Sequence, residues 1–315
     1  YGYGYYNEFR RASALGKKFG LNVYDADGEL IESEAVRRKG LTQNNYGALY
    51  NVSYHDDAWD VIGGLSAQMF RCNHWGYLTY IANEEVERQY LTDGGKYKYY
   101  DSDADKNDYS WFVKAAYNFG SGWNAFADMQ MRIVDYTTDG VNDKFIKGKK
   151  DGRKFYTQQQ LNIDETYVFY NPKAGISYTR GGHKAYASVA YANREPERNN
   201  FTDNSSAALP KAEHLFDTEL GYQYRTANWY ASANLYYMRY INQFVMTGAK
   251  SDIGEAITSN IKNSYRLGAE LSAGWSPLQW LSLEGNAALS QNKLKNFTEE
   301  VEAWDTEAVH NTYAK

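Results

Sequence analysis

Apolar and polar residues alternate along much of the chain, and the alternation is clearest between residues 266 and 291. Two arms of about ten residues flank a short turn at Pro277-Leu278-Gln279. Successive side chains of a β-strand point to opposite faces, so this pattern predicts a hairpin with one apolar and one polar face. The residues that share the apolar face are Leu267, Ala269, Leu271, Ala273, Trp275, Leu281, Leu283, Ala287 and Leu289.

The same alternation recurs in strand pairs from Tyr46 onward. The predicted strands cover residues 46–54, 59–69, 111–119, 123–133, 168–178, 185–191, 216–224 and 229–237, followed by the hairpin above. Short turns at residues 55–58, 120–122, 180–182, 226–228 and 277–279 alternate with longer connections, which we predict as loops at 71–107, 137–163, 194–215 and 249–260. Residues 1–45 are expected to form mostly a long loop.

The strand lengths and the order of the connections favour a membrane barrel. A strand that crosses a bilayer at a tilt needs about 9–11 residues, and outer-membrane barrels have short periplasmic turns and long outer loops. Aromatic residues also flank the predicted short turns, as expected for the girdle at a membrane interface. These residues are Tyr54, Trp59, Phe119, Trp123, Tyr178, Tyr224, Trp229, Trp275 and Trp280.

We therefore predict an all-β fold, a transmembrane antiparallel up-and-down β-barrel. Its ten to twelve strands would form part of a larger barrel, since transporters with a plugged lumen use about 22 strands. The alternative is a soluble β-sandwich or propeller, in which the apolar faces would be buried between sheets.

Composition agrees with a barrel and excludes several other classes. The 315 residues include 31 Tyr, 8 Trp and 13 Phe, and the net charge of −5 gives no basic excess for nucleic acid. The mean hydropathy of −0.72 argues against membrane-spanning helices but not against strands that have one polar face. Cys72 is the single cysteine, so an internal disulfide is excluded. No signal peptide is recognisable at Tyr1, which suggests a mature or partial sequence.

Five segments resemble TonB-dependent outer-membrane receptors, especially those of Bacteroidetes-type bacteria. The segments are Asn171-Pro172-Lys173-Ala174-Gly175, then residues 192–201 (ANREPERNNF) with 209–222, and then residues 234–243 with 264–271. Ala212-Glu213 stands where the family has a "PE" element. The resemblance covers most of residues 46–297.

The resemblance implies a receptor of the Gram-negative outer membrane that takes up a bulky scarce nutrient, such as a ferric siderophore, haem or cobalamin. Uptake would be energised through the TonB complex, by way of a plug domain that has no counterpart in these 315 residues. We therefore expect residues 1–315 to be a partial receptor barrel. A structural or adhesin-like outer-membrane barrel without active transport is the alternative.

The candidate ligand contacts are cationic and aromatic residues in the predicted outer loops and upper lumen. They could bind an anionic chelate, or they could simply pack against other loops. The predicted contacts are Arg71, His74, Trp75, Tyr77, Tyr80, Arg132 and Arg194. For haem, the sequence offers His74 and His214 in predicted outer loops, and Asn193-Arg194-Glu195-Pro196 in place of the family's "FRAP" box.

Metal binding and catalysis have weaker support in the sequence. Asp101, Asp103 and Asp105 resemble part of an oxygen-ligand calcium loop, but Lys106 and Phe112 replace the expected Gly and Glu, which favours a solvated acidic loop. We expect no resident cofactor other than a possible calcium ion. Neither a G-x-S-x-G motif nor a P-loop occurs, so we expect no enzymatic activity, and a barrel lipase or protease is the enzyme alternative.

Overall fold

The computed structural model describes residues 2–92, 95–203, 209–250 and 256–297. The chain divides into two compact units, which are described separately. Unit 1 comprises Tyr1–Ala48, Ser66–Tyr109 and Ile133–Tyr167, and unit 2 comprises Leu49–Leu65, Ser110–Arg132 and Val168–Lys315.

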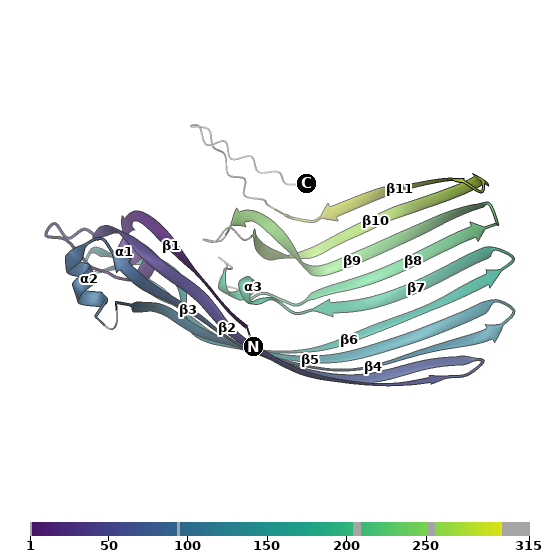
Figure 1. Cartoon of the computed structure of the whole chain (residues 1–315), viewed down its shortest axis with the longest axis horizontal. Coiled ribbons are helices and arrows are strands. Elements are labelled where there is room, and N and C mark those ends of the chain that lie inside the picture. Colours follow the sequence, from purple (N-terminus) through teal and green to yellow (C-terminus); the bar gives the residue numbers. More distant parts are fainter. Residues whose placement is uncertain (1, 93–94, 204–208, 251–255, 298–315) are drawn as a thin grey trace. The chain divides into compact units, whose positions relative to one another are not determined.

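Eleven strands make up most of the described residues, and each is hydrogen-bonded to its neighbours in sequence (Figure 1). They are β1 (Gly2–Ala14), β2 (Glu32–His55), β3 (Trp59–Ile81), β4 (Tyr97–Gly120), β5 (Trp123–Lys150), β6 (Arg153–Arg180), β7 (His183–Arg194), β8 (Glu213–Arg225), β9 (Trp229–Lys250), β10 (Ala256–Leu278) and β11 (Leu281–Leu294). This confirms the all-β, antiparallel up-and-down prediction and a strand number between ten and twelve. In the described part of the chain, β1 and β11 are the two edges of the sheet.

The short turns lie where the alternation predicts them. Residues 56–58, 121–122, 181–182, 226–228 and 279–280 separate successive strands. In the last turn, Pro277 and Leu278 still belong to β10, so the turn starts two residues later than predicted. Glycines permit the tight β4–β5 connection, where Gly120 and Gly122 both have positive φ.

Most of the predicted loops are wrong, because the strands continue well past the alternating segments. Residues 1–45 contain β1 and the start of β2, and residues 71–107 are largely the ends of β3 and β4. Residues 137–163 form a hairpin that turns at Asp151-Gly152, both with positive φ, which is the geometry of a type I′ turn. The predicted connection between β7 and β8 is confirmed for residues 195–203 and 209–212, with one short helix at Arg198–Thr202. Residues 204–208 of this connection, and residues 251–255 of the predicted loop at 249–260, lie outside the described residues.

Unit 1 has a small apolar core formed by two short helices and the sheet. The helices are α1 (Leu15–Phe19) and α2 (Glu84–Tyr90), and the side chain of Asn83 accepts a hydrogen bond from the Val86 amide to cap α2. The core residues are Leu15, Phe19, Leu21, Ala35, Leu78, Ile81, Val86, Tyr99 and Tyr100. No described helix has the length and apolar character needed to cross a membrane.

In unit 2, the polar face of the sheet is kept in register by aromatic rings that lie over glycines. Tyr186 of β7 stands directly opposite Gly221 of β8, and Tyr236 of β9 stands opposite Gly268 of β10. A Cβ atom on either glycine would overlap the facing tyrosine ring. The glycines therefore leave room for rings to lie flat on this face, as in the aromatic rescue of strand glycines.

Candidate functional site

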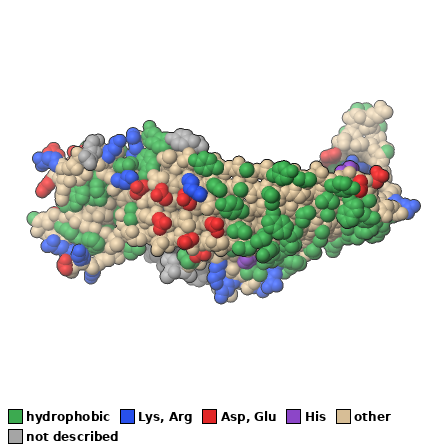
Figure 2. All heavy atoms as spheres, turned by 90° about the horizontal axis from the view of Figure 1, so that it is seen from below, with side chains coloured by type: hydrophobic (Ala, Val, Ile, Leu, Met, Phe, Trp, Pro, Cys, Tyr) green, Lys and Arg blue, Asp and Glu red, His purple; other side chains and the backbone are tan. Residues whose placement is uncertain are grey.

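The apolar face of unit 2 forms a continuous exposed belt across the strands. Its large side chains have between about two fifths and seven tenths of their surface exposed, including Leu220, Leu235, Leu271 and Leu289. Figure 2 shows hydrophobic side chains gathered in a broad patch on the face that it presents. Exposed apolar area of this extent marks a surface that faces lipid or a partner. The apolar residues are thus exposed on one face of a single sheet, not buried between two sheets as the soluble alternative requires.

The height of this belt matches a bilayer. At one end Trp229 stands opposite Trp275, and ten residues along the same two strands Arg239 stands opposite Tyr265. Ten residues at about 3.3 Å each span about 33 Å. A tilt of about 45° reduces this to about 23 Å along the barrel axis, close to the apolar band of about 25 Å in outer-membrane barrels.

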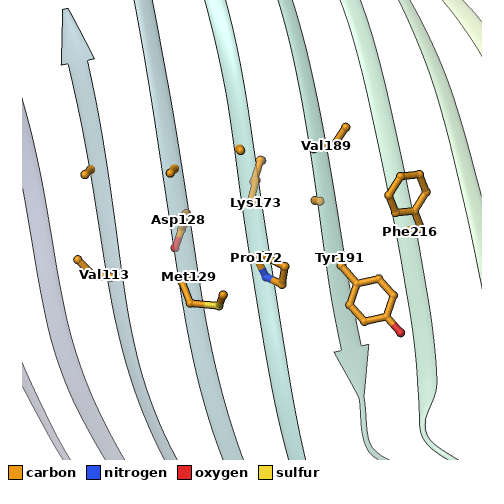
Figure 3. A pocket seen from close by; sticks show the side chains of 12 residues that line it. Val113, Asp128, Met129, Pro172, Lys173, Val189, Tyr191 and Phe216 are labelled. Atoms are coloured by element: carbon orange, nitrogen blue, oxygen red, sulfur yellow. The ribbon is translucent and has the colours of Figure 1, made fainter.

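The belt contains a groove where β6 and β7 separate (Figure 3). Their ladder ends at Lys173 opposite Ala190, next to Pro172, which has no amide hydrogen to donate. Beyond this point the side chain of Asn171 accepts a hydrogen bond from the Asn193 amide, and the Asn193 side chain donates to the Tyr170 carbonyl. The groove has a volume of about 450 Å³. Its apolar lining includes Val113, Ala115, Ala127, Met129, Pro172, Ala174, Val189, Tyr191 and Phe216.

The opposite face of unit 2 carries paired charges. Arg132 of β5 donates two hydrogen bonds of 2.8 Å to the carboxylate of Glu195, one to each oxygen. Arg194 lies 3.2 Å from Glu213, and its guanidinium stacks over the ring of Phe244. Both predicted arginines therefore lie on the polar face, as expected, although acidic partners already engage them.

The Arg132–Glu195 pair also helps to place the segment that follows β7. Glu195 precedes α3 (Arg198–Thr202), whose first turn is closed by a capping box between Glu197 and Asn200. Asn200 in turn donates a hydrogen bond to the Thr258 hydroxyl on β10. Hydrogen bonds thus connect this segment to β5 on one side of the β7–β8 hairpin and to β10 on the other side.

In unit 1, the structure reveals a charge network that the sequence analysis missed. Glu8 of β1 stands opposite Arg37 of β2 and accepts hydrogen bonds of 2.7 Å from both Arg37 and Arg10. Lys39 forms an ion pair with Asp143. Arg37 lies nine residues before Tyr46, where the apolar alternation of β2 begins, so the network lies outside the segment that faces lipid.

The pKa values of two groups in the network, Glu8 and Tyr99, are shifted in opposite directions. Burial acts to raise the pKa of Glu8, but hydrogen bonds from Arg10 and Arg37 outweigh it, so the pKa lies below its usual value. Burial raises the pKa of Tyr99, which keeps this phenol neutral, although the charge of Arg37 acts in the other direction. The Tyr99 hydroxyl has no hydrogen-bond partner among the described residues. The network therefore combines a guanidinium that is almost fully buried with a buried phenol whose hydroxyl has no partner among the described residues.

Residues of β3 contact the three aspartates that were considered separately as calcium ligands. Arg71 lies 3.5 Å from Asp105, and the Asn73 amide donates to both Asp101 and Asp103 at 2.8 and 2.9 Å. The three aspartates lie on strand β4, so the prediction of a solvated acidic loop is wrong. Within the described residues, no group of three or more His, Cys, Asp or Glu is arranged to hold a metal ion. A calcium site there stays a prediction.

The remaining predicted contacts fall on different faces of β3, because side chains alternate along a strand. Trp75 stacks on Tyr3 and donates to the Thr42 hydroxyl, and Tyr77 contacts Trp75 and the ammonium of Lys98. His74 lies on the alternate face, with its Nε2 3.4 Å from the sulfur of Cys72, and Tyr80 is on that same face and exposed. Neither His74 nor His214 is in a loop as predicted: His214 belongs to β8 and its Nδ1 lies 2.5 Å from Asn193.

Comparisons with known proteins agree with this fold. The family model described as "TonB dependent receptor-like, beta-barrel" matches residues 1–312. Similar solved structures are the copper transporter OprC (TM-score 0.62, 12% identity, 93% of this chain and 43% of that chain) and the ferric-catecholate import receptor Fiu from E. coli K12 (0.54, 13%, 86% and 40%). The ferric yersiniabactin uptake receptor FyuA from Yersinia pestis is also similar (0.54, 14%, 84% and 40%). The chain thus spans about two fifths of the length of these proteins. No curated protein sequence matches it.

Proposed function

Because the chain belongs to the family of TonB-dependent receptor β-barrels, we propose that it is part of an outer-membrane receptor that imports a bulky scarce nutrient. A ferric siderophore, haem or cobalamin is the proposed kind of ligand. Import would be energised by the TonB complex, acting through a plug domain in a part of the protein beyond these 315 residues. The single observation that carries the proposal is the match of the family model over almost the whole chain.

The chain is a barrel segment of the Gram-negative outer membrane, as the family and the apolar belt indicate. The similar structures are described as a copper transporter, a ferric-catecholate import receptor and a ferric yersiniabactin uptake receptor. These descriptions support import as the proposed class of function. The proposal requires binding and passage of the ligand and no bond chemistry, so the protein would not act as an enzyme.

The polar faces of the two units supply groups that suit an anionic chelate. Arg194 is about half exposed beside Glu213, and an approaching carboxylate or catecholate could compete for its guanidinium. The ligand contacts proposed from the sequence, including Arg71, Trp75 and Tyr77, remain proposals of the same kind.

Growth and uptake in a deletion strain test this function. The strain would be supplied with ferric siderophores, haem or cobalamin one at a time, and complemented with the full-length gene. We expect loss of growth on one of these nutrients and full rescue by the gene. Unchanged growth on every nutrient, together with unchanged accumulation of labelled nutrient, would reject import and favour a structural or adhesin-like barrel.

A variant pair then links uptake to the polar face. Arg194→Gln removes a cation from the end of β7, whereas Lys184→Gln removes one from the same face near the short turn, ten residues away. We expect the first variant to lower the affinity for the nutrient and the second to leave it unchanged. Equal effects would show that Arg194 is no ligand contact.

A further inference from the structure

One row of side chains crosses five strands of unit 2 at the end of the apolar belt farthest from the short turns. Strand register places its members directly opposite one another, from β7 to β11. The row consists of Tyr191, Phe216, Arg239, Tyr265 and Lys293. All five alternate in phase with the apolar residues of their strands, so they lie on the face that contacts lipid.

Two cations in this row have no acidic neighbour. Arg239 and Lys293 are exposed, and neither forms an ion pair with a residue that the structure describes. From the row of Trp229 and Trp275 up to this row, the outward positions of β7–β11 include no Asp or Glu. Interior carboxylates such as Glu219 and Glu270 are on the other face of the sheet. The outward surface is therefore positive at this level.

The level of the row is that of the hydrocarbon boundary. It lies about 23 Å along the axis from the tryptophan row beside the short turns, when ten residues of about 3.3 Å are tilted by about 45°. Short turns of such barrels face the periplasm, which puts the row at the outer leaflet. The backbones of β9 and β11 are two strand spacings apart, about 10 Å. Two long side chains at that separation can reach one phosphate group from both sides.

The apolar groove adjoins the cations. Tyr191 and Phe216 belong to the row and also line the groove, and Phe216 stands directly opposite Arg239. Figure 3 shows Val113, Met129, Pro172 and Val189 along the rest of its length. A phosphate held at Arg239 would therefore leave an attached acyl chain beside the groove, which is almost wholly apolar. Charge and shape together fit a phosphorylated lipid better than a free anion.

We propose that this surface is a binding site for a phosphorylated lipid of the outer leaflet, with its phosphate between Arg239 and Lys293 and an acyl chain in the groove lined by Pro172, Tyr191 and Phe216. The proposal depends on the membrane location of the barrel and not on its role in nutrient import. A failure of either one would leave the other intact.

Lipid retention by the full-length protein tests the site. The protein would be purified in an uncharged detergent and titrated with lipid A, with lipid A stripped of its phosphates, or with inorganic phosphate, and bound lipid would be counted by native mass spectrometry. We expect the double variant Arg239→Gln/Lys293→Gln to bind lipid A roughly tenfold more weakly, as expected for the loss of charged hydrogen bonds. Lipid A without phosphates should bind the variant and the unmodified protein equally.

Matched variants separate the site from general effects of charge and volume. Lys184→Gln removes a cation from the opposite face and should not change retention, whereas Arg239→Lys should retain most of it. Ala174→Leu fills the groove and should weaken binding several-fold, while Ala233→Leu, on the belt outside the groove, should not. Equal retention by the double variant and the unmodified protein would overturn the proposal. Displacement of lipid A by an equal concentration of inorganic phosphate would also overturn it and indicate a free-anion site.

Discussion

The Arg132–Glu195 ion pair is expected to be one of the strongest side-chain interactions on the polar face of unit 2. Its two hydrogen bonds are both 2.8 Å long, and the side chains are only 23% and 9% exposed. Charged hydrogen bonds contribute about 1.5–3 kcal/mol each, and breaking a buried pair costs about 3–5 kcal/mol. Because Arg132 keeps some contact with water, we expect a coupling free energy of about 2–3 kcal/mol.

A double-mutant cycle measures this coupling directly. The free energy of unfolding in urea would be determined for the full-length protein, for Arg132→Ala, for Glu195→Ala and for the double variant. Arg132→Ala should lower the free energy of unfolding more than Glu195→Ala, because it leaves the more buried carboxylate without its two N–H donors. The Lys154–Glu29 pair, 54% and 67% exposed at 3.0 Å, is the control and should show no measurable coupling. A coupling at Arg132–Glu195 as small as that of the control would refute the reasoning.

Three further predictions concern the polar face and the unit 1 network. Gly221→Ala would force the Tyr186 ring off its position and should destabilise the barrel by about 1–3 kcal/mol, whereas Gly285→Ala, which meets open space, should not; urea unfolding compares the two. Tyr99→Phe should raise the free energy of unfolding by about 1 kcal/mol, because it removes a buried hydroxyl without a partner, and a clear loss of stability would contradict this. The lowered pKa of Glu8 means that its contribution to stability is complete above about pH 4.3 and is lost as the pH falls through the lowered value. Glu8→Gln should remove this part of the acid dependence, and an unchanged pH profile of the urea midpoint would count against it.

The apolar belt could be predicted from the sequence because two different media act on the two faces of each strand. Leu267, Leu271 and Trp275 recur at even spacing since hydrocarbon contacts only one side of β10. The same constraint locates the short turns, where the alternation ends at an aromatic residue.

Beyond the belt the alternation disappears, and the predicted loops were wrong for that reason. Where both faces of a strand contact water or other polar groups, backbone hydrogen bonds still form the strand. Neither face then has to be apolar, so the sequence shows no alternation. One signal was available: Asp151-Gly152 is a typical type I′ hairpin sequence, and it lies within the segment predicted as a loop at 137–163. The two-residue turn there could have been predicted from these residues alone.

The unit 1 network could not be predicted, because it depends on long-range register. Glu8 and Arg37 are 29 residues apart and meet only because β1 pairs with β2. Arg71 and Asp105 likewise meet through β3 and β4, although each was selected separately for its charge. Charged residues in segments without periodicity indicate candidates, but strand pairing decides which of them become partners.

The two faces of the strands also explain why a chain with a mean hydropathy of −0.72 resides in a membrane. On β10 and β11, Glu270 and Glu284 point away from the side that carries Leu271 and Leu283. A shift of one residue in register would exchange these positions and place carboxylates in hydrocarbon. The mean hydropathy is therefore an average over a lipid-facing surface, a polar interior and long strand extensions outside the belt. Register, more than overall hydrophobicity, is what fits this sequence to the bilayer.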